Sequence, residues 1–113
     1  MATDIKASLQ NCSISAQKVR LVIDLVRGQK AVTALDTLKY LPKAAANPVR
    51  KLLASAVANA EENYGINRDD LVVYAISADE APTRKWRRFG ARGRFKPLLK
   101  RSSHVTVVLR EKE

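Results

Sequence analysis

The sequence is poor in several residue types, and each shortage narrows what the protein can be. It has one cysteine, Cys12, so no disulfide can form within the chain and no pair of thiols is available to a metal. No apolar run approaches the ~20 residues that a membrane-spanning helix needs. The first residues lack the basic-then-apolar order of a signal peptide. We therefore expect a cytosolic protein with no bound metal, no cofactor and no membrane contact.

Acidic residues are missing from one long segment. Residues 81–110 contain ten Lys and Arg and no Asp or Glu, whereas residues 1–80 hold ten basic and nine acidic side chains. Almost all of the net charge of +10 therefore belongs to this one segment. Such a segment repels itself and gains most from contact with a dense polyanion, and nucleic acid is the commonest polyanion in a cell.

The polarity pattern of the first part of the chain predicts a strand and a helix. Polar and apolar residues alternate over residues 3–10, which is the period of a strand with one buried face. A helix is predicted over residues 15–28, with Ser15 as the N-cap and Gly28 just beyond the last turn.

Two further helices are predicted. Residues 31–41 have apolar residues at helical spacing, namely Val32, Leu35, Leu38 and Leu41. Asn47-Pro48 is typical of an N-cap followed by the first helical residue, and this third helix ends at Gly65. Its predicted inward face has the strongest periodicity in the chain and consists of Val49, Leu52, Leu53, Ala56, Val57 and Ala60.

The remaining elements complete an α+β fold in a single domain over residues 1–113. Residues 71–78 are rich in β-branched and aromatic types and predict a central strand, and residues 103–110 alternate again. The order strand, three helices, strand, strand predicts a small antiparallel sheet with the three helices packed on one face. The aromatic residues assigned to this core are Tyr40, Tyr64 and Tyr74.

The connection between the last two strands predicts a long β-hairpin. About 24 residues separate these strands, which is more than an ordinary connection needs. Pro82 and Pro97 lie almost symmetrically about Gly90, where a turn needs the freedom of glycine. We expect an arm over residues 79–101, with its tip at residues 88–94, that projects by roughly 30 Å.

Cationic and aromatic residues are interleaved along this arm. Cations bind phosphate and aromatic rings stack on unpaired bases, so the combination predicts RNA as the partner. For Phe95, packing across the ribbon is an equally good interpretation. The RNA-binding residues predicted in the arm are Arg84, Lys85, Trp86, Arg87, Arg88, Arg92, Arg94, Lys96, Lys100 and Arg101.

Three cations of the predicted helices, Lys18, Arg20 and Lys51, are also expected to bind RNA phosphate. For Arg27 and Arg50 the sequence leaves open whether they bind phosphate or only keep a helix surface soluble.

The lone histidine and the paired acids favour structural roles. His104 has no carboxylate or cysteine at a spacing that would suit catalysis, so a structural or RNA-facing role is expected. Asp79 is expected to pair with Lys100 or Arg101 across the base of the arm.

Five motifs in register resemble one known family over nearly the whole chain. They are SAQKVRLV at residues 15–22, RG at 27–28, SAVANA at 55–60, DEAP at 79–82 and LKRSSHVTVV at 99–108. In this order and spacing they resemble the bacterial-type ribosomal protein twenty-two family of the large subunit. The tip departs from the family pattern, because Phe89-Gly90 stand where a proline and then an arginine are common.

The resemblance implies a structural protein without catalytic activity, placed in the ribosome in the cytoplasm. It implies a globular body on the outside of the large subunit and a hairpin that enters the ribosomal RNA and lines the nascent-peptide exit tunnel. The implied partners are large-subunit rRNA, neighbouring ribosomal proteins and the nascent peptide, with no homo-oligomer. The tunnel-lining tip falls on Arg88, Phe89, Gly90, Ala91, Arg92, Gly93 and Arg94.

Two other functions are alternatives to an rRNA-binding role. An architectural DNA-binding protein also uses proline-bearing β-arms, which wedge into the minor groove, but such proteins are usually obligate dimers with fewer helices before the arms. A nuclease with His104 as its acid or base is the second alternative. The sequence has no glycine-rich phosphate cradle, nucleophile motif or metal-ligand spacing to support an enzyme.

Overall fold

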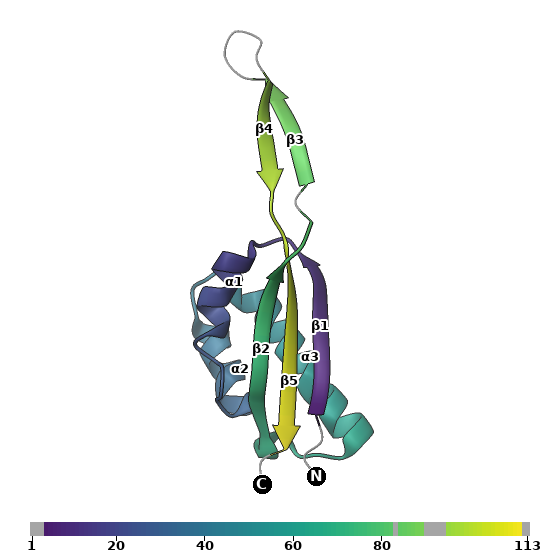
Figure 1. Cartoon of the computed structure of the whole chain (residues 1–113). Helices are drawn as coiled ribbons and strands as arrows, with labels where there is room; N and C mark the ends of the chain where they lie inside the picture. Colours follow the sequence, from purple (N-terminus) through teal and green to yellow (C-terminus); the bar gives the residue numbers. More distant parts are fainter. Residues whose placement is uncertain (1–3, 83, 90–94, 112–113) are drawn as a thin grey trace.

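The body of the protein is a three-stranded antiparallel sheet with helices on one face (Figure 1). A computed structural model describes residues 4–82, 84–89 and 95–111, and for residues 84–89 and 95–100 it describes the backbone alone. The strand order is β1-β5-β2, and both pairings are antiparallel. The strands of this sheet are β1 (Asp4–Cys12), β2 (Leu71–Glu80) and β5 (Ser103–Glu111), and the helices are α1 (Ala16–Ile23), α2 (Ala31–Tyr40) and α3 (Ala46–Tyr64). The predicted α+β class is therefore confirmed.

The centre of the sheet is β5, so the prediction of β2 as the central strand is wrong. Alternate residues of β5 are fully buried under the helices: Val105, Val107 and Leu109. The outer edge of β2 is covered by the segment before α2, where Gly28 N–H donates to Val73 O at 3.0 Å and Val73 N–H donates to Gln29 O at 2.8 Å. Because this edge is protected, β2 has the apolar composition of an inner strand although it lies at the side of the sheet.

The first helix ends earlier than predicted. It stops at Ile23, and residues 24–28 form turns that still bury Val26 completely. Gly28 has the positive φ of 81° that the sequence suggested. It uses that conformation to reach β2 rather than to end a helix, because its N–H acceptor is Val73.

The second helix turns part of the predicted face into the core, since Leu38 is buried and Leu35 and Leu41 pack against the core from its rim. Its buried residues are Ala31, Ala34 and Leu38. Val32, Leu35 and Leu41 are only half-buried. The small side chains of Ala31 and Ala34 allow close packing beside Leu38, which leaves Val32, Leu35 and Leu41 at the rim of the core.

The third helix has the predicted buried face, and all six residues of that face lie in the core. It begins one residue before the expected N-cap, with Ala45 in the cap position and Asn47-Pro48 inside the first turn. Proline is tolerated there because first-turn N–H groups have no intrahelical acceptor. At the other end Gly65 takes a positive φ of 65° and closes the helix as predicted.

The aromatic residues assigned to the core lie on the surface instead. Tyr40, Tyr64 and Tyr74 are 78%, 52% and 53% exposed. The buried residues in the described part of the chain are aliphatic, apart from Cys12 and Ser103. Tyrosine needs a partner for its hydroxyl when it is buried, whereas Val, Leu, Ile and Ala fill the narrow space between sheet and helices without one.

One side-chain cluster links the three strands near the chain ends. Arg110 of β5 lies with its guanidinium carbon 3.4 Å from the centroid of the Tyr74 ring of β2. The same guanidinium donates to Asp4 of β1 at 2.5 Å. This hydrogen bond holds the pKa of the Asp4 carboxyl below its ordinary value.

Beyond the sheet, the chain continues as a separate two-stranded ribbon. β3 (Arg84–Phe89) and β4 (Phe95–Lys100) pair antiparallel, and Figure 1 shows them rising from the end of the three-stranded sheet. A hydrogen bond from Ala81 N–H to Ser102 O at 3.0 Å joins the two chain segments just beyond the β2–β5 ladder. The molecule is accordingly elongated, with principal extents of 64 × 25 × 19 Å. None of the described helices has the length and hydropathy required to cross a membrane.

The packing of α3 predicts how much stability is lost when a buried side chain is shortened. Leu53→Ala removes a side chain that is completely buried, so we expect a loss of about 2–5 kcal/mol in the free energy of unfolding. Urea denaturation followed by circular dichroism measures this loss. The matched control is Leu21→Ala, since Leu21 is 63% exposed and should change stability by less than about 0.5 kcal/mol. Equal losses in the two variants would contradict the described packing.

Candidate nucleic-acid interface

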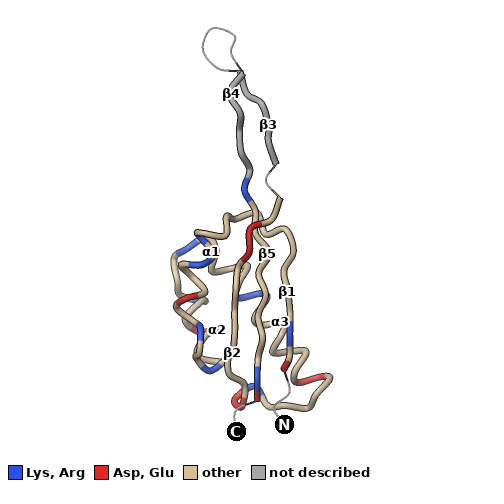
Figure 2. The backbone as a smooth tube through the Cα atoms, in the orientation of Figure 1, with Lys and Arg blue, Asp and Glu red and all other residues tan. Residues whose placement is uncertain are grey.

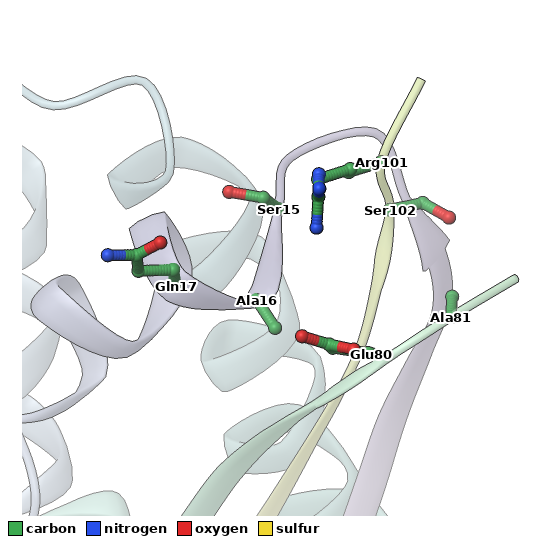
Figure 3. Close-up of a pocket in the computed structure, with 7 residues that line it drawn as sticks. All are labelled: Ser15, Ala16, Gln17, Glu80, Ala81, Arg101 and Ser102. Atoms are coloured by element: carbon green, nitrogen blue, oxygen red, sulfur yellow. The ribbon is translucent and has the colours of Figure 1, made fainter. Parts of the chain in front are cut away.

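The body and the ribbon meet at a cleft of about 360 Å³ (Figure 3). Its walls come from the start of α1, the end of β2 and the segment that joins β4 to β5. The lining residues are Ser15, Ala16, Gln17, Glu80, Ala81, Arg101 and Ser102. In Figure 3 the side chain of Arg101 points into this cleft between Ser15 and Glu80.

The local charge of this cleft is mixed. Arg101 is exposed and brings a guanidinium, while Glu80 brings a carboxylate. The first turn of α1 contains no acidic residue and Ser15 makes no capping hydrogen bond, so free N–H groups add a partial positive charge. An anion here would be held by Arg101 and the helix start together, against the opposing charge of Glu80.

The expected ion pair between Asp79 and Arg101 is not present. In the ladder Asp79 lies opposite His104, one of the residues of β5. The ion pairs among the side chains that the structure describes are Arg27–Asp24, Arg68–Glu61 and Arg110–Asp4. The alternative partner, Lys100, has a side chain outside the described residues.

Two arginines of the α1 region bind the backbone of the β2 edge strand. Arg20 Nε donates to Ala78 O at 3.0 Å, and Arg27 Nη2 donates to Ile76 O at 2.9 Å. These bonds satisfy carbonyl groups that an edge strand would otherwise leave open. The structure therefore gives Arg27 a structural role. Arg20 has a structural role as well, and its phosphate contact stays a prediction.

The other predicted phosphate contacts of the body lie in separate places. Lys18 is exposed on α1, one residue beyond the cleft lining. Lys51 is exposed on α3, in a groove of about 400 Å³ shared with Ser8 and Leu9 of β1. The structure thus brings Arg101 close to the start of α1 but does not gather Lys51 into the same cleft. Figure 2 shows the charges of the body spread over several elements.

The ribbon is described by its backbone register. Arg84 lies opposite Lys100 and Arg88 lies opposite Lys96, so two of the paired positions set cation against cation. Like charges directly opposite each other destabilise a strand pair. The other pairs include Trp86 opposite Leu98 and Phe89 opposite Phe95.

Several predicted site residues fall outside what the structure describes. The side chains of the ribbon residues carry no description, namely those of Arg84, Lys85, Trp86, Arg87, Arg88, Phe89, Lys96 and Lys100. The rest of the predicted tip lies wholly outside the described residues: Gly90, Ala91, Arg92, Gly93 and Arg94.

His104 has a structural partner. Its Nδ1 accepts a hydrogen bond at 3.0 Å from the N–H of Asn11, a residue with φ of 55° at the bulge between Leu9 and Cys12. The bulge leaves this N–H without a ladder partner, and the imidazole supplies one. No cluster of His, Cys, Asp or Glu suited to a metal ion occurs among the described residues.

The fold and the charge distribution together define a nucleic-acid-binding protein that projects a cationic ribbon from a small α+β body. The chain matches the family described as ribosomal protein L22p/L17e over residues 7–110. It is 44% identical over 111 residues to the large ribosomal subunit protein uL22 of Pediococcus pentosaceus, a match that covers 98% of this chain and 94% of that protein. The chain belongs to the ribosomal protein L22p/L17e family.

Membership of this family confirms the resemblance seen in the sequence. Members are structural, non-enzymatic proteins of the ribosome, which agrees with the predicted absence of catalysis. The nuclease and DNA-binding alternatives find no support in this family. Ribosomal RNA and other ribosomal proteins are the partners that follow from it.

The edge-strand role of Arg20 leads to a stability prediction. Arg20→Met keeps most of the apolar stem but removes the donor to Ala78 O, so we expect a loss of about 1 kcal/mol in the free energy of unfolding. Chemical denaturation measures it. Lys18→Met on the same helix is the control, because Lys18 is exposed and should have little effect. If the two variants are equally stable, the Arg20 bond does not contribute to the fold.

Proposed function

We propose that the protein is a structural constituent of the large ribosomal subunit and that it binds large-subunit rRNA chiefly through the β3–β4 ribbon. The observation that carries this proposal is the family match over residues 7–110, which includes the whole ribbon. The protein then resides in the ribosome, in the cytoplasm, and supports assembly of the subunit.

The charge of the ribbon supports RNA as its partner. Residues 81–110 contain ten cations and no acid. The register also places Arg84 opposite Lys100 and Arg88 opposite Lys96. An isolated two-stranded ribbon is marginal in water, and this one carries additional repulsion. Phosphates of rRNA offset that repulsion, so ribbon and RNA stabilise each other.

The arm over residues 79–101 enters the rRNA, and its tip at residues 88–94 lines the nascent-peptide exit tunnel. The body stays at the outer surface as a single domain and monomer, beside neighbouring ribosomal proteins. The passing nascent peptide is then a partner of the tip. Family membership and the direction in which the ribbon leaves the body support this arrangement (Figure 1).

The class and partner can be tested together by sedimentation. A tagged full-length chain in a lysate should cosediment with the large subunit on a density gradient, and with intact ribosomes. Treatment with EDTA, which separates the subunits, should leave it with the large one. Sedimentation at the top of the gradient or with the small subunit would contradict the proposal.

The electrostatic role of the ribbon predicts a change in the salt dependence of RNA binding. Binding to transcribed large-subunit rRNA should weaken with salt by roughly 0.7–0.9 in log K per log unit of salt for each phosphate neutralised. Replacing Arg84, Arg87 and Arg88 together by Gln should lower that slope by about 2–3. An unchanged slope would show that these residues do not contact phosphate.

Trp86→Ala separates stacking from charge in the same assay. Removal of the ring should weaken binding by roughly 1–3 kcal/mol while the salt slope stays the same. Undiminished affinity would exclude stacking of Trp86 on RNA.

A further inference from the structure

A second segment without acidic residues lies in the body itself. Residues 37–60 contain four cations and no Asp or Glu, whereas the rest of residues 1–80 holds six cations and nine acids. The net charge of residues 1–80 is therefore close to zero although the cations and the acids are separated along the chain. The four cations are Lys39, Lys43, Arg50 and Lys51.

The fold brings three of these cations around one cleft. Lys39, Lys43 and Arg50 line a space of about 310 Å³ where the end of α2 meets the start of α3. The other lining residues are Leu38, Leu41, Ala46 and Asn47, so no carboxylate takes part. Arg50 Nη2 donates to Asn47 Oδ1 at 2.8 Å, a neutral partner that positions the guanidinium without neutralising it.

The charges of α3 run against what helix stability favours. Acidic side chains are favourable near a helix N-terminus and basic ones near its C-terminus. In α3 the first turn has no acid and the last turn has no base. Arg50 and Lys51 instead follow the first turn, and Glu61 and Glu62 lie near the other end. Glu61 forms an ion pair with Arg68. Arg50 and Lys51 have no acidic partner among the described side chains, and an anion bound near the start of α3 would supply one.

An exposed aromatic ring adjoins the cationic cleft. Tyr40, the last residue of α2, is 78% exposed, the largest value among the described large hydrophobic residues. Lys39 Nζ lies 5.6 Å from the centroid of its ring. A cationic cleft suits a phosphate, and an exposed aromatic ring suits a base. The two features together match an unpaired nucleotide.

We propose that the α2–α3 cleft is a second RNA-binding site, independent of the ribbon, which holds a backbone phosphate of single-stranded rRNA with the adjacent base stacked on Tyr40. The inference rests on the proposed function, because it takes the rRNA of the same subunit as its ligand. It goes beyond that function by placing a phosphate and its base at one defined cleft of the body, which is lined by none of the cations Lys18, Arg20 and Lys51. An acidic segment of a neighbouring protein would satisfy the cations but would leave the ring of Tyr40 without a base, and the test below distinguishes the two.

The direct test is a photo-crosslink in assembled large subunits. A diazirine amino acid replaces Tyr40 in the full-length chain, and the same amino acid replaces Tyr64 as the control. Tyr64 is also an exposed tyrosine at a helix end, but it follows Glu61 and Glu62. We expect a nuclease-sensitive crosslink from position 40 and at most a trace from position 64.

The crosslink also separates this inference from the function on which it rests. A crosslink from position 40 to protein alone, or none from subunits that contain the variant, would overturn the second site while leaving the ribosomal role intact. Failure of both variants and of the unmodified chain to enter large subunits would overturn the proposed function and the second site together.

A binding measurement gives an independent readout. With transcribed large-subunit rRNA and the full-length chain, Lys43→Gln should lower the salt slope by roughly 0.7–0.9. Lys6→Gln is the control, since Lys6 is also exposed but lies on β1 of the sheet, outside the cleft. Tyr40→Ala should raise the dissociation constant about 5-fold or more at an unchanged slope. Equal slopes for Lys43→Gln and Lys6→Gln, or full affinity of Tyr40→Ala, would overturn the second site.

Discussion

The register of the β3–β4 ladder sets cations opposite cations, and this constraint governs how the ribbon can be stabilised. Arg84 opposite Lys100 and Arg88 opposite Lys96 repeat the unfavourable pairing twice, in a segment that supplies no acid. A two-stranded ribbon has no core to offset this cost. The body helps only at the base, where the β2–β5 ladder and the hydrogen bond from Ala81 to Ser102 set the direction of the two limbs. Beyond that point the proposed rRNA contact supplies the opposing charge, in agreement with family membership.

The cations of the body divide into two kinds with different physical roles. Arg20 and Arg27 bind carbonyl groups of β2, and the resulting cover keeps an apolar edge strand from pairing with other chains. Lys39, Lys43 and Arg50 line a cleft without any carboxylate and have no ion-pair partner among the described side chains. Cations of the first kind stabilise the folded chain by themselves. Those of the second kind line the proposed second RNA site, so in this proposal the body and the ribbon each bind RNA.

Much of the fold could be predicted because its signals are local. The alternation of residues 103–110, the periodicity of α3 and the glycine at 65 each report burial or backbone conformation within a few residues. The predictions that were wrong or incomplete concern features that depend on contacts between residues far apart in the sequence. The N–H acceptor of Gly28 is Val73, and the guanidinium of Arg20 reaches Ala78, neither of which a local pattern can show. Strand order also depends on pairing across the chain, so β2 was given the central place that β5 holds. The acid-free run at 81–110 was visible in the sequence, whereas the site at α2 and α3 required the fold to bring Lys39, Lys43 and Arg50 together.

The central claim is that the cationic ribbon is completed by ribosomal RNA. A cryo-electron microscopy map of large subunits that carry the tagged protein tests it most directly, since it shows what surrounds β3 and β4. We expect rRNA phosphates on both limbs, close to Arg84, Arg88, Lys96 and Lys100. A ribbon that lies in solvent, or against protein alone, would contradict this explanation of the structure.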